Sequence, residues 1–121
     1  MQYMLLIYEN ESVYGDKTAG SAAIMEVVGK HMALSQSLGA ARIAGAGLKN
    51  TNAATTLRTS GGKQALHDGP FAETKEQLGG YYLIDVPDLD AAIAVARKIP
   101  LYAEGAIEIR PVLNPDERKA Q

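Results

Sequence analysis

Residues 68–76 (sequence DGPFAETKE) gather three carboxylates and an amine into one short segment. Glycine and proline restrict the backbone there to a turn, which is a suitable place to present a carboxylate. At the rim of an apolar strand face Asp68 would be a general base, while Glu73 and Lys75 would bind the substrate. The other interpretation is that Asp68 only caps the turn that follows it.

A second charged pair, Glu108 and Arg110, lies two residues apart near the C-terminus. On an extended strand both side chains point to one face, and Ile107 and Ile109 point to the other. A carboxylate and a guanidinium so placed can pair with each other or bind a ligand. They are therefore candidates for substrate binding, and Arg110 with Lys75 would hold an anionic group. The alternative is a structural ion pair.

His31 occupies the middle of the apolar stripe of a predicted helix, and Ser35 lies one turn later on the same stripe. A polar residue there costs free energy unless it has a partner. His31 is thus either a core or interface histidine satisfied by a neighbour, or a catalytic acid and base that works near neutral pH. Tyr8 and Tyr82 end or begin apolar strands, where their hydroxyl groups could line a pocket.

Several function classes lack support in the composition. The chain of 121 residues has no cysteine, and its two histidines, His31 and His67, are too far apart for a metal motif. No glycine-rich phosphate loop is present, so we expect neither a metal nor a cofactor. The net charge is −2 and the basic residues are dispersed, which disfavours nucleic-acid binding.

The sequence also indicates a compartment. The absence of cysteine suits a reducing environment. The apolar run at residues 4–7 is too short for a signal peptide, and no run approaches the ~20 residues that span a bilayer. We expect a cytoplasmic protein that makes no membrane contact.

The hydrophobic pattern predicts the elements that must position these side chains. Alternation and apolar runs predict strands at residues 3–8, 42–48, 55–60, 63–68, 81–86 and 106–110. Helical periodicity predicts helices at residues 21–38, ended by Gly39, and 88–99, capped by Asp88. Residues 15–20 are expected to be a connector, Phe71 a core anchor, and the polar segment ending at Gln77 one or two helical turns.

The order of the elements predicts the fold. The two glycines at positions 61 and 62 indicate a hairpin over residues 55–68. Without this insertion the order is β-α-β-β-α-β, which is the ferredoxin-like α+β pattern with both helices on one face of an antiparallel sheet. Residues 1–113 would form one domain and residues 114–121 a charged tail. The bare sheet face predicts a homodimer.

Three segments carry a family resemblance: YMLLIY at 3–8, DGPFAETKEQLGGYYLI at 68–84 and EIRPV at 108–112. They resemble the YCII-related proteins, specifically the DGPF branch, over about residues 1–113. The resemblance implies a dimeric α+β barrel of ferredoxin-like chains with a cleft between sheet and helices. It also implies a distant kinship of fold with small enzymes such as muconolactone isomerases.

The resemblance implies functions as well. YCII-related proteins are suspected of acid-base catalysis by a histidine and an aspartate, and Asp68 lies at the family's aspartate motif. The usual histidine position aligns with Val28, and His31 lies about one turn later. We expect a small-molecule-binding protein that acts as an acid-base enzyme of isomerase, lyase or hydrolase type. The alternative is a non-catalytic module that binds a metabolite or partner, since DGPF proteins are found beside extracytoplasmic-type sigma factors.

Overall fold

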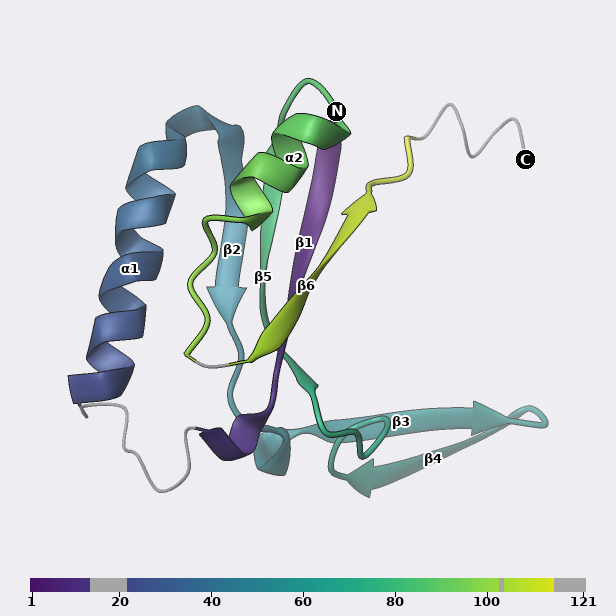
Figure 1. Cartoon of the computed structure of the whole chain (residues 1–121). Helices are drawn as coiled ribbons and strands as arrows, with labels where there is room; N and C mark the ends of the chain where they lie inside the picture. Colours follow the sequence, from purple (N-terminus) through teal and green to yellow (C-terminus); the bar gives the residue numbers. More distant parts are fainter. Residues whose placement is uncertain (14–21, 103, 115–121) are drawn as a thin grey trace.

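The computed structural model describes residues 1–13, 22–102 and 104–114. It has an α+β architecture of four sheet strands, two α-helices and a separate strand pair (Figure 1). The strands are β1 (Gln2–Glu9), β2 (Arg42–Gly47), β3 (Thr55–Ser60), β4 (Lys63–Asp68), β5 (Gln77–Asp85) and β6 (Gly105–Pro111). The α-helices are α1 (Ala22–Leu38) and α2 (Leu89–Ala96), and short 3₁₀ turns are η1 (Glu11–Val13), η2 (Gly39–Ala41) and η3 (Thr51–Ala53). The predicted connector at residues 15–20 and most of the predicted tail lie outside the described residues.

The main sheet has the strand order β2-β5-β1-β6, and every neighbouring pair is antiparallel. With β3 and β4 set aside, this is the order expected for a ferredoxin-like chain. Strand β1 is central, as its continuous apolar run predicts. Because side chains alternate along β1, Leu5, Ile7 and Glu9 all point to the face that the helices cover.

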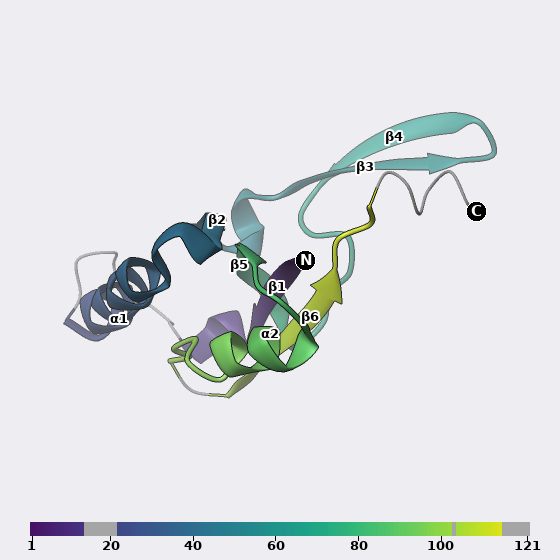
Figure 2. The same ribbon diagram turned by 90° about the horizontal axis from the view of Figure 1, so that it is seen from above.

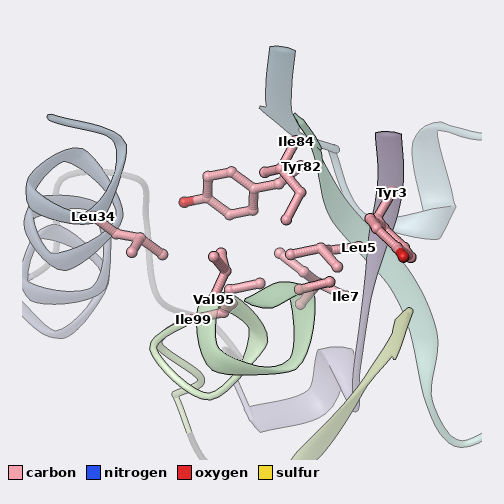
Figure 3. Packing of buried hydrophobic residues seen from close by; sticks show 9 residues of the cluster. Tyr3, Leu5, Ile7, Leu34, Tyr82, Ile84, Val95 and Ile99 are labelled. Atoms are coloured by element: carbon pink, nitrogen blue, oxygen red, sulfur yellow. The ribbon is translucent and has the colours of Figure 1, made fainter. Parts of the chain in front are cut away.

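The hydrophobic core lies between this sheet face and the two helices (Figure 3). Its buried members are Tyr3, Leu5, Ile7, Leu34, Tyr82, Ile84, Ala92, Val95 and Ile99. The helix α2 and the turn after it contribute three of them, whereas Leu34 is the one contributed by the residues of α1 whose burial is described. The sheet is therefore closely covered by α2 and only loosely by α1.

Much of α1 is not packed against the sheet. Met25, Val28 and Met32 are exposed, although each is a large apolar side chain. Both helices nevertheless lie on the same side of the sheet (Figure 2). The space between α1 and the sheet is where a cavity forms.

Two predicted helix ends are confirmed. Gly39 follows α1 with a φ of 54°, the left-handed conformation that a glycine cap adopts. The Asp88 side chain accepts a hydrogen bond of 2.9 Å from the backbone N–H of Ala91, which caps α2. The helix itself ends at Ala96, earlier than predicted, because Lys98 and Ile99 continue the chain with tighter three-residue turns.

Strand β5 begins earlier than the sequence predicts, and the expected helical turns before it are wrong. Gln77 already belongs to β5, and the chain bends without a helix over residues 71–76. The reason lies at Gly80, where an added Cβ would lie 2.9 Å from the Ala46 carbonyl oxygen. Glycine here permits a close approach of β2 and β5, so it extends the strand and does not end a helix.

The strands β3 and β4 form an arm that projects from the sheet (Figures 1 and 2). Gly61 and Gly62 both have positive φ, 57° and 77°, as a primed two-residue turn requires. Leu57 pairs with Leu66, and both are exposed.

Phe71, which follows the arm, is 73% exposed. The expectation of a core anchor is therefore wrong. Its ring lies 5.1 Å from the Arg58 guanidinium carbon, so a neighbouring cation takes the place of core packing.

The second face of the main sheet carries apolar side chains, and neither of the described α-helices covers it. Met4, Leu6, Tyr81 and Leu83 lie there at neighbouring register positions and are only half-buried. We call these four residues the open face. Among the helices described, none is long and apolar enough to cross a membrane.

Candidate functional site

A cavity of about 850 Å³ lies between α1 and the sheet. Its volume is in the range of small-molecule sites, roughly 300–1,000 Å³. Much of its wall is apolar, and polar side chains from both α1 and the sheet contribute the rest. The lining includes Ile7, Val27, Val28, His31, Arg42 and Tyr82.

His31 and Tyr82 meet inside this cavity. His31 lies on the inner side of α1, and Tyr82 points inward because it alternates with Tyr81 along β5. Figure 3 shows the Tyr82 hydroxyl directed toward α1. The distance from His31 Nδ1 to Tyr82 Oη is 2.7 Å, and the two rings are stacked with centroids 5.8 Å apart. This is a short and well-defined hydrogen bond.

Burial sets the protonation states of the pair in opposite directions. Desolvation lowers the pKa of His31 below 6.5, against the opposing effects of the Glu9 charge and a hydrogen bond with the Pro100 backbone. Desolvation raises the pKa of Tyr82 above 10.0, against opposing effects of Ser35 and Arg42. At neutral pH the imidazole is therefore uncharged and the phenol keeps its proton.

These partners define the direction of the hydrogen bonds. When the imidazole N–H donates to the Pro100 carbonyl, Nδ1 remains as an acceptor. The Tyr82 hydroxyl then donates to Nδ1 over 2.7 Å.

Glu9 supplies a buried negative charge in the cavity wall. The residue is 8% exposed, and its Oε2 accepts a hydrogen bond of 3.2 Å from the Tyr102 backbone N–H. Its charge favours the protonated form of His31. Glu9 would therefore stabilise an imidazolium formed during a reaction.

Arg42, the first residue of β2, supplies a positive charge in the cavity wall. Its Nη2 donates to the Gly45 carbonyl at 3.1 Å, and its guanidinium carbon lies 5.9 Å from the Tyr82 ring centroid. The other carboxylate of the lining, Glu11, is engaged elsewhere: it accepts hydrogen bonds from the Thr51 backbone N–H and hydroxyl, at 2.7 and 2.6 Å.

Comparison with known proteins identifies the family of this chain. A family model described as the YCII-related domain matches residues 1–115. The chain belongs to the YCII-related family. An uncharacterized protein of Rhizobium meliloti (strain 1021) is 52% identical to it over 64 residues, 51% of this chain and 52% of that protein. The matched part thus spans about half the length of that relative.

Two of the candidate residues named from sequence, His31 and Tyr82, are brought together in the cavity of this YCII-related domain. Three others meet on the opposite sheet face, away from the cavity. There the Tyr8 hydroxyl donates to Glu108 Oε1 at 3.3 Å, and Glu108 Oε2 pairs with Arg110 at 3.4 Å. The Arg110 side chain is 70% exposed, so this ion pair is largely in contact with solvent.

The DGPF segment of the YCII-related domain lies elsewhere. Asp68 ends β4 with an exposed side chain, and Glu73 and Lys75 are also exposed. None of the three lines the helix–sheet cavity. Apolar residues of the segment, including Phe71, line a second cavity of about 560 Å³ that also reaches Tyr8.

Two polar residues of the cavity, Glu9 and Arg42, were not predicted from the sequence. Glu9 continues the inward alternation of Leu5 and Ile7, so the strand period contains a signal for a buried carboxylate. For Arg42 the sequence gives only a weak indication of a site, namely that it lies three residues before a glycine, Gly45. Within residues 1–13, 22–102 and 104–114, no three side chains of the metal-binding types come together.

Proposed function

We propose that this YCII-related chain binds a small organic molecule in the helix–sheet cavity and moves a proton on it. Tyr82 would contact the substrate, and His31 would act as the base behind it. The observation that carries the proposal is the 2.7 Å hydrogen bond between Nδ1 and Oη inside a ligand-sized cavity. The opposite pKa directions support it, because a neutral acceptor faces a protonated donor.

The proton would move along the hydrogen bond between Tyr82 and His31. The Tyr82 oxygen takes a proton from a substrate carbon while its own proton passes to Nδ1 of His31. The electron pair of the broken C–H bond stays on the substrate as an enolate-type anion. His31 becomes an imidazolium, which the Glu9 charge and the Pro100 carbonyl favour. Return of the proton to another atom of the substrate completes an isomerisation.

In an alternative mechanism Asp68 would be the base that takes the proton, as the DGPF motif suggests. Its side chain is exposed at the end of β4 and does not line the helix–sheet cavity. A base in contact with bulk water gains nothing from desolvation, so the proposal leaves Asp68 outside the reaction. The run at residues 68–76 still supports membership of the DGPF branch.

The proposal includes a homodimer. The open face presents Met4, Leu6, Tyr81 and Leu83 on one side of the sheet, and a second copy would cover these side chains. Two sheets packed through this face would form a dimeric α+β barrel. We place this dimer in the cytoplasm, which suits a chain without cysteine.

A second candidate is a non-catalytic module for a metabolite or a protein partner such as a sigma-factor system. The exposed apolar residues of the projecting arm, Leu57 and Leu66, favour it. This function needs no proton transfer, which is how the two candidates are separated.

Binding is tested by a thermal-shift screen against a metabolite library. A ligand present at 100 times its Kd stabilises the fold by about 2.7 kcal/mol. Hits are then measured on Val28→Trp, which fills the cavity from α1, and on Met25→Trp, an exposed position of the same helix that does not line it. Stabilisation should disappear only in Val28→Trp. Equal stabilisation of both variants would mean that the ligand binds elsewhere.

Catalysis is tested with the hits in D₂O. Exchange of a substrate C–H for deuterium, followed by NMR, reports proton transfer without knowledge of the product. Tyr82→Phe and His31→Gln should each slow the exchange about 100-fold or more, a typical loss for acid-base groups. Binding without any exchange in the wild-type protein would favour the non-catalytic module.

A further inference from the structure

We infer that the helix–sheet cavity selects ligands that carry a carboxylate on an apolar body, and that Arg42 binds the carboxylate. The inference rests on the proposed function and deepens it, because it names the chemical class of the ligand. Two independent features carry it: the state of the guanidinium, and the composition of the wall around it.

The guanidinium of Arg42 is only partly satisfied. Of its five N–H donors, one on Nη2 bonds the Gly45 carbonyl at 3.1 Å. The buried Nε has no hydrogen-bond partner among the described residues. The Nη1 donors also have no hydrogen-bond partner among the described residues and, unlike Nε, are not buried, so they are the donors that a ligand can reach. A carboxylate is the acceptor that matches a guanidinium best.

The acids of the cavity are committed to other groups. Glu11 accepts two hydrogen bonds from Thr51, and Glu9 accepts one from the Tyr102 backbone. None of the ion pairs among the described residues includes Arg42. The cavity therefore holds an arginine whose carboxylate partner does not come from Glu9 or Glu11.

A glycine makes the position of the guanidinium possible. A Cβ at position 45 would lie 2.9 Å from Arg42 Nη2, 3.1 Å from the Tyr81 carbonyl oxygen and 3.3 Å from Tyr82 Cδ1. The bare backbone of β2 thus leaves room for Arg42 to lie beside the Tyr82 ring. The same ring carries the hydroxyl that bonds His31, so a carboxylate on Arg42 would place the rest of the ligand near the proton path.

Part of the remaining wall fits an apolar ligand body, because Ile7, Ile24, Val27 and Val28 also line the cavity. A fully hydrated anion such as phosphate would gain nothing from these side chains. An aromatic or alicyclic monocarboxylate would use both the cation and the apolar wall.

The test uses two isosteric pairs of probes, benzoate with benzamide and acetate with acetamide, and inorganic phosphate as a competitor. Dissociation constants are measured by NMR titration of the full chain. Benzoate should bind at least about tenfold more tightly than benzamide, which corresponds to 1.4 kcal/mol, and more tightly than acetate. Phosphate should not displace it.

Variants assign this preference to Arg42. Arg42→Gln should abolish the advantage of benzoate over benzamide, and Arg42→Lys should retain part of it because the charge remains. Gly45→Ala should weaken benzoate binding. Arg58→Gln, which removes a guanidinium from the arm near Phe71, should change nothing. A far-UV spectrum and a thermal melt check that each variant is folded.

Several results would overturn the inference. They are equal binding of benzoate and benzamide, an unchanged preference in Arg42→Gln, displacement by phosphate, or no saturable binding of benzoate. If benzamide binds as well as benzoate and shifts the His31 and Tyr82 signals, the carboxylate inference fails while the proposed cavity function stands. If library ligands bind equally to Val28→Trp, the proposed function itself fails.

Discussion

His31 Nδ1 and Tyr82 Oη lie 2.7 Å apart, although 51 residues separate them in the chain. Helix α1 carries one partner and strand β5 the other, and the cavity lies between these two elements. The pair therefore forms only when helix and sheet are assembled.

Removal of the Tyr82 hydroxyl should destabilise the fold. Tyr82→Phe leaves the Nδ1 acceptor of His31 without its partner, which typically costs about 1–2 kcal/mol. Urea unfolding measures the loss. Tyr81→Phe is the matched control, since no hydrogen bond of the Tyr81 hydroxyl occurs in the part of the chain that the structure describes. Equal losses of unfolding free energy in the two variants would show that the hydrogen bond between His31 and Tyr82 does not stabilise the fold.

The stability should depend on pH through His31. Its pKa is lowered below the 6.5 of an unfolded chain, mainly by desolvation, so the unfolded state binds a proton first. The contribution is fully present above about 6.5 and is lost as the pH falls from there toward the folded pKa. Urea unfolding should show that the free energy of unfolding of the wild type decreases as the pH falls through this range. The decrease should be smaller in His31→Gln. Identical pH profiles would contradict the desolvated state of His31.

Removal of the Glu9 charge should lower the pKa of His31 further. Glu9→Gln keeps an oxygen for the Tyr102 backbone N–H but no longer favours the imidazolium. An NMR titration of the His31 ring protons measures the change. Glu26→Gln removes the same charge from the exposed side of α1, where Glu26 pairs with Lys30, and serves as the control. Equal changes in both variants would show a general charge effect instead of a specific one.

A charge on the open face should dissociate the proposed dimer. Leu83→Glu places a carboxylate among Met4, Leu6 and Tyr81, where a covering copy would have to desolvate it. Sedimentation velocity should show a dimer for the wild type and a monomer for this variant. Leu66→Glu on the exposed arm is the control and should remain dimeric. A monomeric wild type would refute the dimer, and a dimer lost only in Leu66→Glu would move the interface to the arm.

Much of the fold follows from local signals in the sequence. The apolar run of β1 indicates a central strand, and Gly39 and Asp88 mark helix ends by their backbone and capping chemistry. The start of β5 could not be predicted in this way. Gly80 is usually read as the end of an element, and only the neighbouring strand shows that it permits a close contact with Ala46.

The candidate site could be predicted from the sequence only in part. The helical period places His31 on an inner face, but its distance from Tyr82 depends on strand order and on how far α1 stands from the sheet. The segment around Asp68 attracts attention because it concentrates charge, yet its exposure is a consequence of the projecting arm. Composition and spacing do not contain that information.

The most direct measurement is a map of NMR signal changes across the whole chain on titration with a ligand from the library screen. The account predicts that the largest changes occur at His31, Tyr82 and Arg42, with a change in the His31 ring nitrogen shifts, while Asp68 and Arg110 are unaffected. Changes concentrated at Asp68 or at Arg110, with His31 and Tyr82 unaltered, would contradict it.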